Sequence, residues 1–209
     1  MTRTRRDPLA EVLLGLKHPH ESVRQRAAIG LGALVTPDLA GRVAATLWEE
    51  PDFFVRESLT WVLTRVPRAA LPYALVALGD ERARVRLTAA HVLGKLGDRS
   101  AVPALVPLTA DSDDDVAAKA CFALARLGDP VAVPALAAYL GRGDRDRRDR
   151  LTRDLADFGP AALPHVEGRL VSSEPAVREH AAEVVALVLA EQRRKDLTLT
   201  RRQPPPSRV

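Results

Sequence analysis

Apolar residues recur along the chain with the period of an α-helix. From Val85 onward, apolar side chains stand at spacings of four, four and three residues, at Val85, Ala89, Leu93 and Leu96. Such spacings place the side chains on one face of a helix. The same spacing returns in five other stretches, which begin at Val23, Val55, Val116, Arg147 and Val177. The pattern therefore predicts six amphipathic helices of one kind in an all-helical chain.

Two sequence markers give these helices a common period of about thirty residues. The valines that start the pattern follow one another at intervals of 32, 30, 31 and 61 residues, and the last interval is two periods. A second series has intervals of 31, 31 and 30 residues and consists of Pro72, Pro103, Pro134 and Pro164. Internal repeats of this length are typical of stacked helical hairpins, in which each unit is covered by the units beside it.

The residues between the helices predict where each hairpin turns. Gly97, Gly128 and Gly159 follow the repeated helix, where a glycine with positive φ commonly ends it. Prolines of the Ala-Val-Pro stretches are expected in the first turn of the next helix, where an N–H group has no intrahelical acceptor. Acidic turns, such as those at Asp80 and Asp111, then precede the repeated helix and can cap it. We therefore expect two helices per repeat, with the repeated helix second.

The motifs Leu-Gly-Asp and Ala-Val-Pro-Ala-Leu, followed by an acidic turn and Val-Arg, resemble the short bacterial HEAT-like repeats, which phycobilin-lyase-type proteins share. The resemblance covers about residues 8–190. It implies an all-α fold, a right-handed α-solenoid of about six two-helix repeats, in which the second helices line the concave face. It also implies that the arginines of the Val-Arg pairs bond the acidic turn of a neighbouring repeat; these are Arg24, Arg56, Arg86 and Arg178.

Positive charge is concentrated at the two ends of the chain. Residues 1–6 carry three basic residues, and residues 191–209 carry six against two acidic ones, whereas residues 7–190 carry 22 basic and 25 acidic residues. The sequence thus divides into a basic N-terminal arm, residues 1–6, a HEAT-repeat α-solenoid, residues 7–190, and a basic, proline-rich tail, residues 191–209. From Arg193 the tail lacks apolar periodicity, so it is expected to be disordered.

The side of each second helix that faces away from the core is the surface left for binding. In the first four repeats it would present large, mainly apolar side chains beside basic ones, a combination that often marks a binding surface. Trp61, with Arg65 one turn later, is the expected anchor pair, because Trp and Arg dominate interface hot spots. The alternative is that Trp61 and Phe122 are core residues. The predicted residues of this concave, partner-binding groove are Ile29, Trp61, Arg65, Leu87, His91, Lys95, Phe122 and Arg126.

The fifth repeat departs from the pattern. Arg147 replaces the first valine, and Asp154 takes a place that is small and apolar in other repeats. Its charges predict ion pairs along a solvated helix, namely Asp146–Arg150, Asp149–Arg153, Arg150–Asp154 and Arg153–Asp157. The alternative interpretation is that this repeat is a partner-binding site or a flexible joint in the solenoid.

No set of residues adds up to an active site, so we expect a protein that is not an enzyme and uses no cofactor and no metal. Deoxyhypusine hydroxylases resemble this architecture and bind iron through several His-Glu pairs in successive repeats, but here only His20-Glu21 has that form. Cys121 occupies a small packing position and is expected to be buried and inert.

These observations favour a non-catalytic scaffold or adaptor that binds a protein partner through the concave face. The alternative is a nucleic-acid-binding or DNA-repair protein, since the alkylpurine DNA glycosylases are HEAT-like and carry aromatic and basic groups on that face. Against it, residues 7–190 are slightly acidic, whereas duplex binding relies on phosphate neutralisation. The start of the chain lacks an apolar stretch, and no run of about 18 apolar residues occurs, so we expect a cytoplasmic protein without membrane contact.

Overall fold

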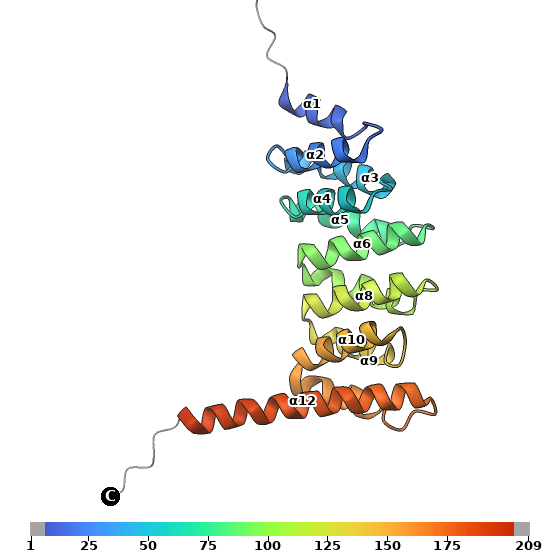
Figure 1. The fold of residues 1–209 in the computed structure, drawn as a ribbon, viewed down its shortest axis with the longest axis vertical. Coiled ribbons are helices and arrows are strands. Elements are labelled where there is room, and N and C mark those ends of the chain that lie inside the picture. Colours follow the sequence, from blue (N-terminus) through green and yellow to red (C-terminus); the bar gives the residue numbers. More distant parts are fainter. Residues whose placement is uncertain (1–6, 203–209) are drawn as a thin grey trace, which may run out of the picture. The chain divides into compact units, whose positions relative to one another are not determined.

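The structure, a computed structural model, describes residues 7–202 and the side chains of residues 7–198. These residues form twelve α-helices and five short 3-10 helices, and no strand occurs among them (Figure 1). The all-α prediction is therefore confirmed, whereas the basic arm at residues 1–6 lies outside the described residues. The chain divides into two compact units, residues 1–101 and 102–209, and we describe each by itself.

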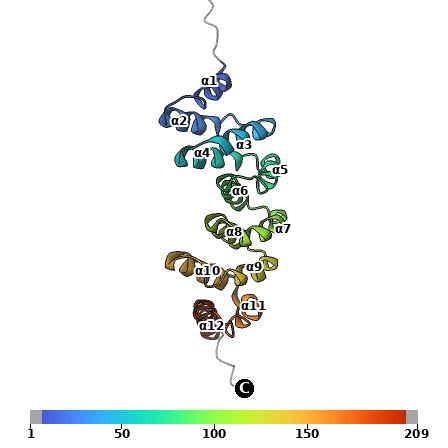
Figure 2. The same ribbon diagram turned by 90° about the vertical axis from the view of Figure 1, so that its right-hand side faces the viewer.

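The first unit contains three helical hairpins. α1 (Pro8–Gly15) pairs with α2 (Glu21–Leu31), α3 (Ala40–Glu49) with α4 (Phe53–Leu63), and α5 (Pro67–Ala77) with α6 (Ala83–Leu96). The 3-10 helix η1 (Pro37–Leu39) leads into α3, and η2 (Arg99–Ala101) follows α6. The second helices α2, α4 and α6 form one layer of this unit, and α3 and α5 lie in the other (Figure 2).

The core of the first unit lies where the repeat pattern placed it. Leu59 and Leu63 of α4, and Ala89 and Leu93 of α6, have exposed fractions of 0%. By contrast, α1 contains no buried residue. The second helices are therefore buried through the residues whose four-residue spacing predicted them.

The second unit contains three further hairpins. α7 (Val102–Leu105) and η3 (Val106–Ala110) pair with α8 (Asp114–Leu127), η4 (Pro130–Ala132) and α9 (Val133–Ala138) with α10 (Arg145–Asp157), and η5 (Gly159–Ala162) and α11 (Leu163–Glu167) with α12 (Pro175–Arg202). Within this unit α8, α10 and α12 form one layer, and α7, α9 and α11 form the other (Figure 2). Each unit is thus a short helical solenoid built from two-helix repeats.

The three glycine ends predicted from the sequence are confirmed, whereas Asp80 and Asp111 accept the backbone N–H groups of Arg82 and Asp113 within the turns and do not cap the following helices. Gly97, Gly128 and Gly159 have φ values of 74°, 63° and 59°, the left-handed conformation that ends a helix without steric cost to glycine. Asp113 caps α8 by accepting the N–H groups of Asp115 and Val116. The prolines of α7, α9 and α11 lie in the first turn, but Pro72 lies inside α5, because that helix begins earlier, at Pro67.

The arginines of the Val-Arg pairs hold the turn of their own hairpin. Each donates to two carbonyl oxygens, six and five residues earlier; the arginines are Arg24, Arg56, Arg86 and Arg178. Carbonyl groups in a turn lack helical N–H partners, and a guanidinium supplies donors for them. The role implied by the family resemblance, a bond to a neighbouring acidic turn, is present for Arg24 in addition, but it is not the feature that all four arginines share.

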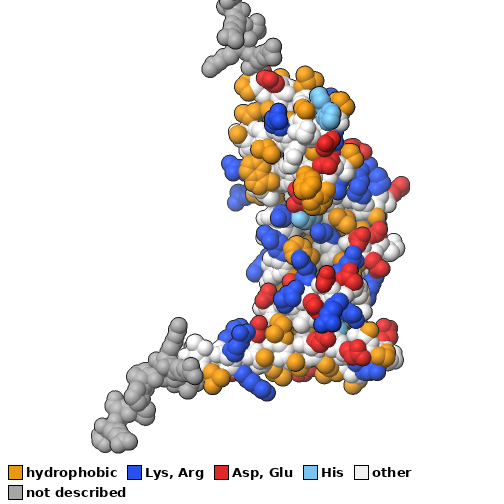
Figure 3. All heavy atoms as spheres, in the orientation of Figure 1, with side chains coloured by type: hydrophobic (Ala, Val, Ile, Leu, Met, Phe, Trp, Pro, Cys, Tyr) orange, Lys and Arg blue, Asp and Glu red, His pale blue; other side chains and the backbone are white. Residues whose placement is uncertain are grey.

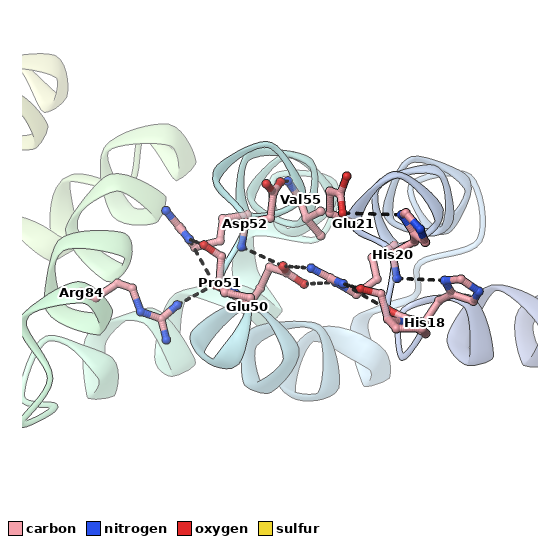
Figure 4. Close-up of polar contacts among 11 residues, drawn as sticks. His18, His20, Glu21, Glu50, Pro51, Asp52, Val55 and Arg84 are labelled. Carbon is pink, nitrogen blue, oxygen red and sulfur yellow. Dashed lines mark hydrogen bonds and ion pairs between the residues drawn. The ribbon is translucent and has the colours of Figure 1, made fainter.

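Glu50 joins the three hairpins of the first unit (Figure 4). Its exposed fraction is only 5%. Arg24 of α2 donates to the two carboxylate oxygens from Nε and Nη2, at 2.9 and 2.8 Å, and the backbone N–H of Asp52 donates to the same carboxylate at 2.9 Å. From the other side, Arg84 of α6 donates to the main-chain oxygens of Glu50 and Trp48. The hydrogen bond to Glu50 raises the pKa of the Arg24 guanidinium.

A buried histidine joins the last two hairpins of the second unit. The Nδ1 atom of His180 accepts the backbone N–H of Gly141 at 3.0 Å. The ring proton is therefore on Nε2, which lies 3.0 Å from both the carbonyl oxygen of Arg148 and the hydroxyl of Thr152. Burial lowers the pKa of His180 and keeps the ring neutral, so this histidine has a structural role.

α12 corrects the prediction made for the tail. The helix runs to Arg202, so the stretch from Arg193 to Arg202 is helical rather than disordered. Residues 190–202 are mostly strong helix formers without proline or glycine, and Gln192 donates to Asp196 one turn later at 3.0 Å. Residues 203–209, with the three consecutive prolines, lie outside the described residues, and the domain boundary at residue 190 stays a prediction.

Glu50→Ala should lower the free energy of unfolding by about 3 kcal/mol, because it leaves the largely buried Arg24 guanidinium without its carboxylate. The matched control is the preceding residue. The Glu49 side chain is 69% exposed and pairs with the exposed Arg82, so Glu49→Ala should change stability by less than about 1 kcal/mol. Denaturant unfolding followed by circular dichroism measures both variants. Equal losses in the two variants would show that Glu50 does not join the hairpins energetically.

Candidate functional site

Six of the eight predicted binding residues lie in the three second helices of the first unit or directly after one of them. α2 carries one of these residues, α4 one and α6 three, Arg65 lies in the turn just after α4, and α4 packs against both α2 and α6. We call this surface the Trp61 face; it consists of Ile29, Trp61, Arg65, Leu87, His91 and Lys95. Ile29, Trp61, Arg65 and Lys95 are exposed, whereas Leu87 and His91 are half-buried.

Trp61 is an exposed side chain held in place from two sides. Its exposed fraction is 46%, which excludes the alternative that it is a core residue. The ring lies against α2 at Gly32, where an added Cβ atom would be 2.0 Å from a ring carbon. The Arg65 guanidinium stands 5.5 Å from the ring centroid, within the range of a cation–π interaction. The small residue at Gly32 is therefore what allows the indole to rest on the neighbouring helix.

Sequence reasoning missed two aromatic residues beside the Trp61 face. Phe53 and Phe54, at the start of α4, are 56% and 64% exposed, and their rings make an edge-to-face contact at 5.4 Å. Phe54 precedes Trp61 by seven residues, so both lie on the same side of α4. Large hydrophobic side chains gather over this part of the first unit in Figure 3. The signal available was a pair of adjacent aromatics in a chain with only 4% aromatic residues.

The half-buried His91 joins two helices of the Trp61 face. Its Nε2 atom lies 2.8 Å from a carboxylate oxygen of Glu57, with side-chain exposures of 14% and 38%. Glu57 is on α4 and His91 is on α6. The mainly apolar row expected from the sequence thus contains a polar contact at His91.

The basic residues of the Trp61 face have no carboxylate partner in the described part of the chain. Arg65 and Lys95 occupy equivalent positions near the ends of α4 and α6. Neither makes an ion pair with any side chain of residues 7–198, and the Arg65 guanidinium contacts only the Trp61 ring among charged and aromatic groups. Positive charge on this face is thus available to an external ligand.

The other two predicted residues, Phe122 and Arg126, belong to α8 in the second unit. Phe122 is half-buried, and its ring has the Arg150 guanidinium at 5.0 Å and the Lys119 ammonium at 5.6 Å. Arg126 is exposed near the end of the helix. Phe122 is therefore less exposed than Trp61, and a continuous groove through the first four repeats stays a prediction.

The charged fifth repeat forms ion pairs different from those predicted. Arg147 pairs with Asp115, and Arg142 donates to Asp114 at 2.7 Å, so both reach the start of α8. None of the four predicted pairs along α10 forms among the described side chains. Two members of the predicted pairs have other partners, because the Arg150 guanidinium stands over the Phe122 ring at 5.0 Å and Asp149 pairs with Arg145 at 3.8 Å.

Asp154 lies at a cavity of about 50 Å³ between α8 and α10, which Cys121, Phe122 and Tyr139 also line. Burial raises the pKa of Asp154 to about 6 and that of the Cys121 thiol to about 12. Cys121 is thus buried and protonated, as expected of an inert thiol. A charged Asp154 lowers the stability of the fold, because its position is an apolar one in other hairpins, where it is occupied by Val62, Val92, Ala123 and Val184.

Side chains that could bind a metal ion are dispersed. Among residues 7–198, no group of three or more His, Cys, Asp and Glu side chains comes together with the geometry of a metal site. His18 and His20 lie in the turn between α1 and α2, and His180 is engaged in the hydrogen bonds described above. No helix of the described part is both long and apolar enough to cross a bilayer.

Comparison with known proteins identifies the repeat. A family model of HEAT repeats matches residues 71–156 and 102–187, which together are more than half of the chain. No curated protein matches the sequence.

Solved structures with a similar fold share little sequence. One is an engineered protein with a TM-score of 0.50 and 17% identity, covering 88% of this chain and 97% of that chain. Another is human deoxyhypusine hydroxylase in complex with glycerol, with a TM-score of 0.50 and 19% identity, covering 86% of this chain and 84% of that chain. A third is a computationally designed armadillo repeat protein for modular peptide recognition, with a TM-score of 0.47 and 16% identity, covering 86% and 99%. At these identities the likeness concerns the fold alone.

Gly32→Ala should destabilise the chain by about 1–3 kcal/mol, because the new methyl group collides with the Trp61 ring. Without that collision the sign would reverse, since Gly32 has a helical φ of −59° and alanine favours a helix. In the Trp61→Ala background the same substitution should therefore be neutral or stabilising by up to about 1 kcal/mol. A double-mutant cycle of denaturant unfolding measures the coupling, and additive effects would show that the ring does not rest on Gly32.

Asp154→Asn should stabilise the chain at pH 7 by about 1 kcal/mol, a figure that allows for the partial solvation of this side chain. The folded-state pKa, about 6, lies above the unfolded value of about 3.9, so ionisation disfavours the fold. The cost is complete above pH 6 and disappears as the pH falls towards 4. The gain in melting temperature should therefore shrink between pH 7 and pH 4, and a gain that does not vary with pH would contradict this explanation.

Proposed function

The chain belongs to the HEAT repeat family, and from this premise we propose that it is a non-catalytic scaffold that binds a protein partner through the Trp61 face. The partner-binding residues are Ile29, Trp61, Arg65, Leu87, His91 and Lys95, joined by Phe53 and Phe54. Phe122 and Arg126 of the second unit are proposed to extend the same interaction.

The exposed but immobilised Trp61 carries this proposal. Interface hot spots are rich in Trp and Arg, and here the two side chains stack on each other at 5.5 Å. Gly32 and Arg65 restrict the indole before any partner arrives, so little side-chain entropy remains to be lost on binding. Three aromatic side chains on one helix also exceed the isolated exposed hydrophobics that a surface normally carries.

The chemistry of the Trp61 face supports binding without catalysis. Its titratable pair, Glu57 and His91, is engaged in a contact between two helices. The single cysteine of the chain is in the other unit, where burial keeps it protonated. The groups that remain accessible on the face are aromatic, aliphatic and basic, and these recognise a partner rather than activate a substrate.

Affinity capture from a lysate of the native host tests the proposal. The full chain should retain a protein partner, and Trp61→Ala should reduce the amount of captured partner by at least about tenfold. The reason is that a central aromatic anchor contributes a large share of the binding energy. The matched control is Tyr73→Ala, since Tyr73 is 47% exposed but lies on α5, in the other layer of the same unit.

Nuclease treatment separates the two candidate classes of partner. A partner that survives nuclease and depends on Trp61 but not on Tyr73 supports the scaffold. If nuclease abolishes all capture, or if the two variants lose the partner equally, the proposed function is wrong.

A further inference from the structure

The Trp61 face carries positive charge that nothing in the described chain neutralises. Arg65 and Lys95 are exposed, stand at equivalent positions of neighbouring helices, and make no ion pair with residues 7–198. The nearby carboxylate, that of Glu57, is engaged by His91 at 2.8 Å. Complementarity across an interface therefore calls for carboxylates on the partner.

The order of side chains along α4 gives the partner a direction. In chain order the exposed residues are Phe54 and Trp61 on the helix and Arg65 in the turn just after it. Phe54 and Trp61 are separated by about 10 Å along the helix axis, and the Arg65 guanidinium lies 5.5 Å from the Trp61 ring centroid. A peptide in the polyproline II conformation advances about 3.1 Å per residue and has three residues per turn, so side chains three residues apart lie on the same side. Such a peptide matches these sites with two apolar side chains about three residues apart, followed about two residues later by a run of carboxylates.

Aromatic and basic groups together also suit a single-stranded nucleic acid, but the charge balance disfavours it. Affinity for nucleic acid depends on neutralising a series of phosphates, and the Trp61 face offers two unpaired cations. Residues 7–190 as a whole carry more acidic than basic residues. A peptide with a short acidic stretch needs no more positive charge than the face supplies.

From these observations we infer that the partner segment is an acidic peptide, in which large apolar side chains precede a cluster of aspartates or glutamates. The apolar side chains contact Phe54, Trp61 and Ile29, and the carboxylates contact Arg65 and Lys95. The inference rests on the proposed function, because it names the chemistry of the partner that the Trp61 face would bind.

Synthetic peptides and the full chain test this chemistry. The first peptide has a leucine and a phenylalanine followed by a run of aspartates; in the second the aspartates are lysines, and in the third the apolar residues are serines. Trp48→Phe leaves Trp61 as the single tryptophan, so its fluorescence reports binding at the face. Oligothymidylate serves as the nucleic-acid probe.

The first peptide should give a saturable change in Trp61 fluorescence, and the second and third should bind at least about tenfold more weakly. Combining Arg65→Glu with Lys95→Glu should lower the affinity for the acidic peptide by at least about tenfold and raise the affinity for the lysine peptide. The matched control combines Arg42→Glu with Arg68→Glu, which reverses two exposed charges on α3 and α5 of the same unit. This control should change affinity by less than about twofold.

Three outcomes would overturn the inference: no saturable binding of the acidic peptide, equal binding of the lysine peptide, or tighter binding of oligothymidylate. If the acidic peptide fails while a captured protein still depends on Trp61, the face binds a partner of other chemistry. In that case the proposed function stands and only the acidic character of the partner is wrong.

Discussion

Each hairpin leaves one apolar side that only the adjoining hairpin covers. Leu59 and Leu63 lose all solvent exposure where α4 packs beside α2 and α6. Full burial of a leucine contributes on the order of 2 kcal/mol, so stacking between hairpins dominates stability within each unit. This constraint fixes the inner face of the second helices and leaves their outer face free to vary. The candidate binding residues lie on that outer face.

Apolar contact alone does not set how far one hairpin slides along the next, because the hydrophobic effect has no direction. Directional bonds at the turns supply that information. Arg24 and Arg84 reach Glu50 from opposite sides, one through its carboxylate and the other through its carbonyl group. In the second unit His180 bonds Gly141 and the main chain of α10 in the same manner. Both sets of hydrogen bonds lie where two helices of different hairpins meet.

The fold could be predicted because burial imposes its own spacing on the sequence. Four-residue intervals mark the buried face, and Gly97 and Gly128 mark helix ends because glycine readily adopts their positive φ. The same reasoning placed Trp61 and Arg65 outside the core by elimination. It could not identify Phe53 and Phe54, because they precede the repeated positions. Nor could it predict which of several carboxylates a long arginine side chain would pair with. Arg147 illustrates the second limit, since it pairs with Asp115 of another hairpin as well as with Asp144 at the start of its own helix.

Exposure alone does not distinguish a binding residue from an incidental one, and Trp61 shows what does. Val76 is 81% exposed, yet it lies on α5, in the layer of the first unit that carries none of the predicted binding residues. Trp61 is less exposed, but the adjoining helix has a glycine where any side chain would collide with the indole. Gly32 follows the last residue of α2 and keeps a helical φ of −59°, so alanine would be tolerated there if the indole ring were absent. The same arrangement holds Tyr73 of α5 against Gly41 of α3, so a ring that rests on a glycine does not by itself mark a binding site. Trp61 differs because its fixed ring lies on the same side of α4 as the exposed Phe54 and contacts the Arg65 guanidinium, which has no carboxylate partner among residues 7–198, so aromatic and basic groups gather on one surface.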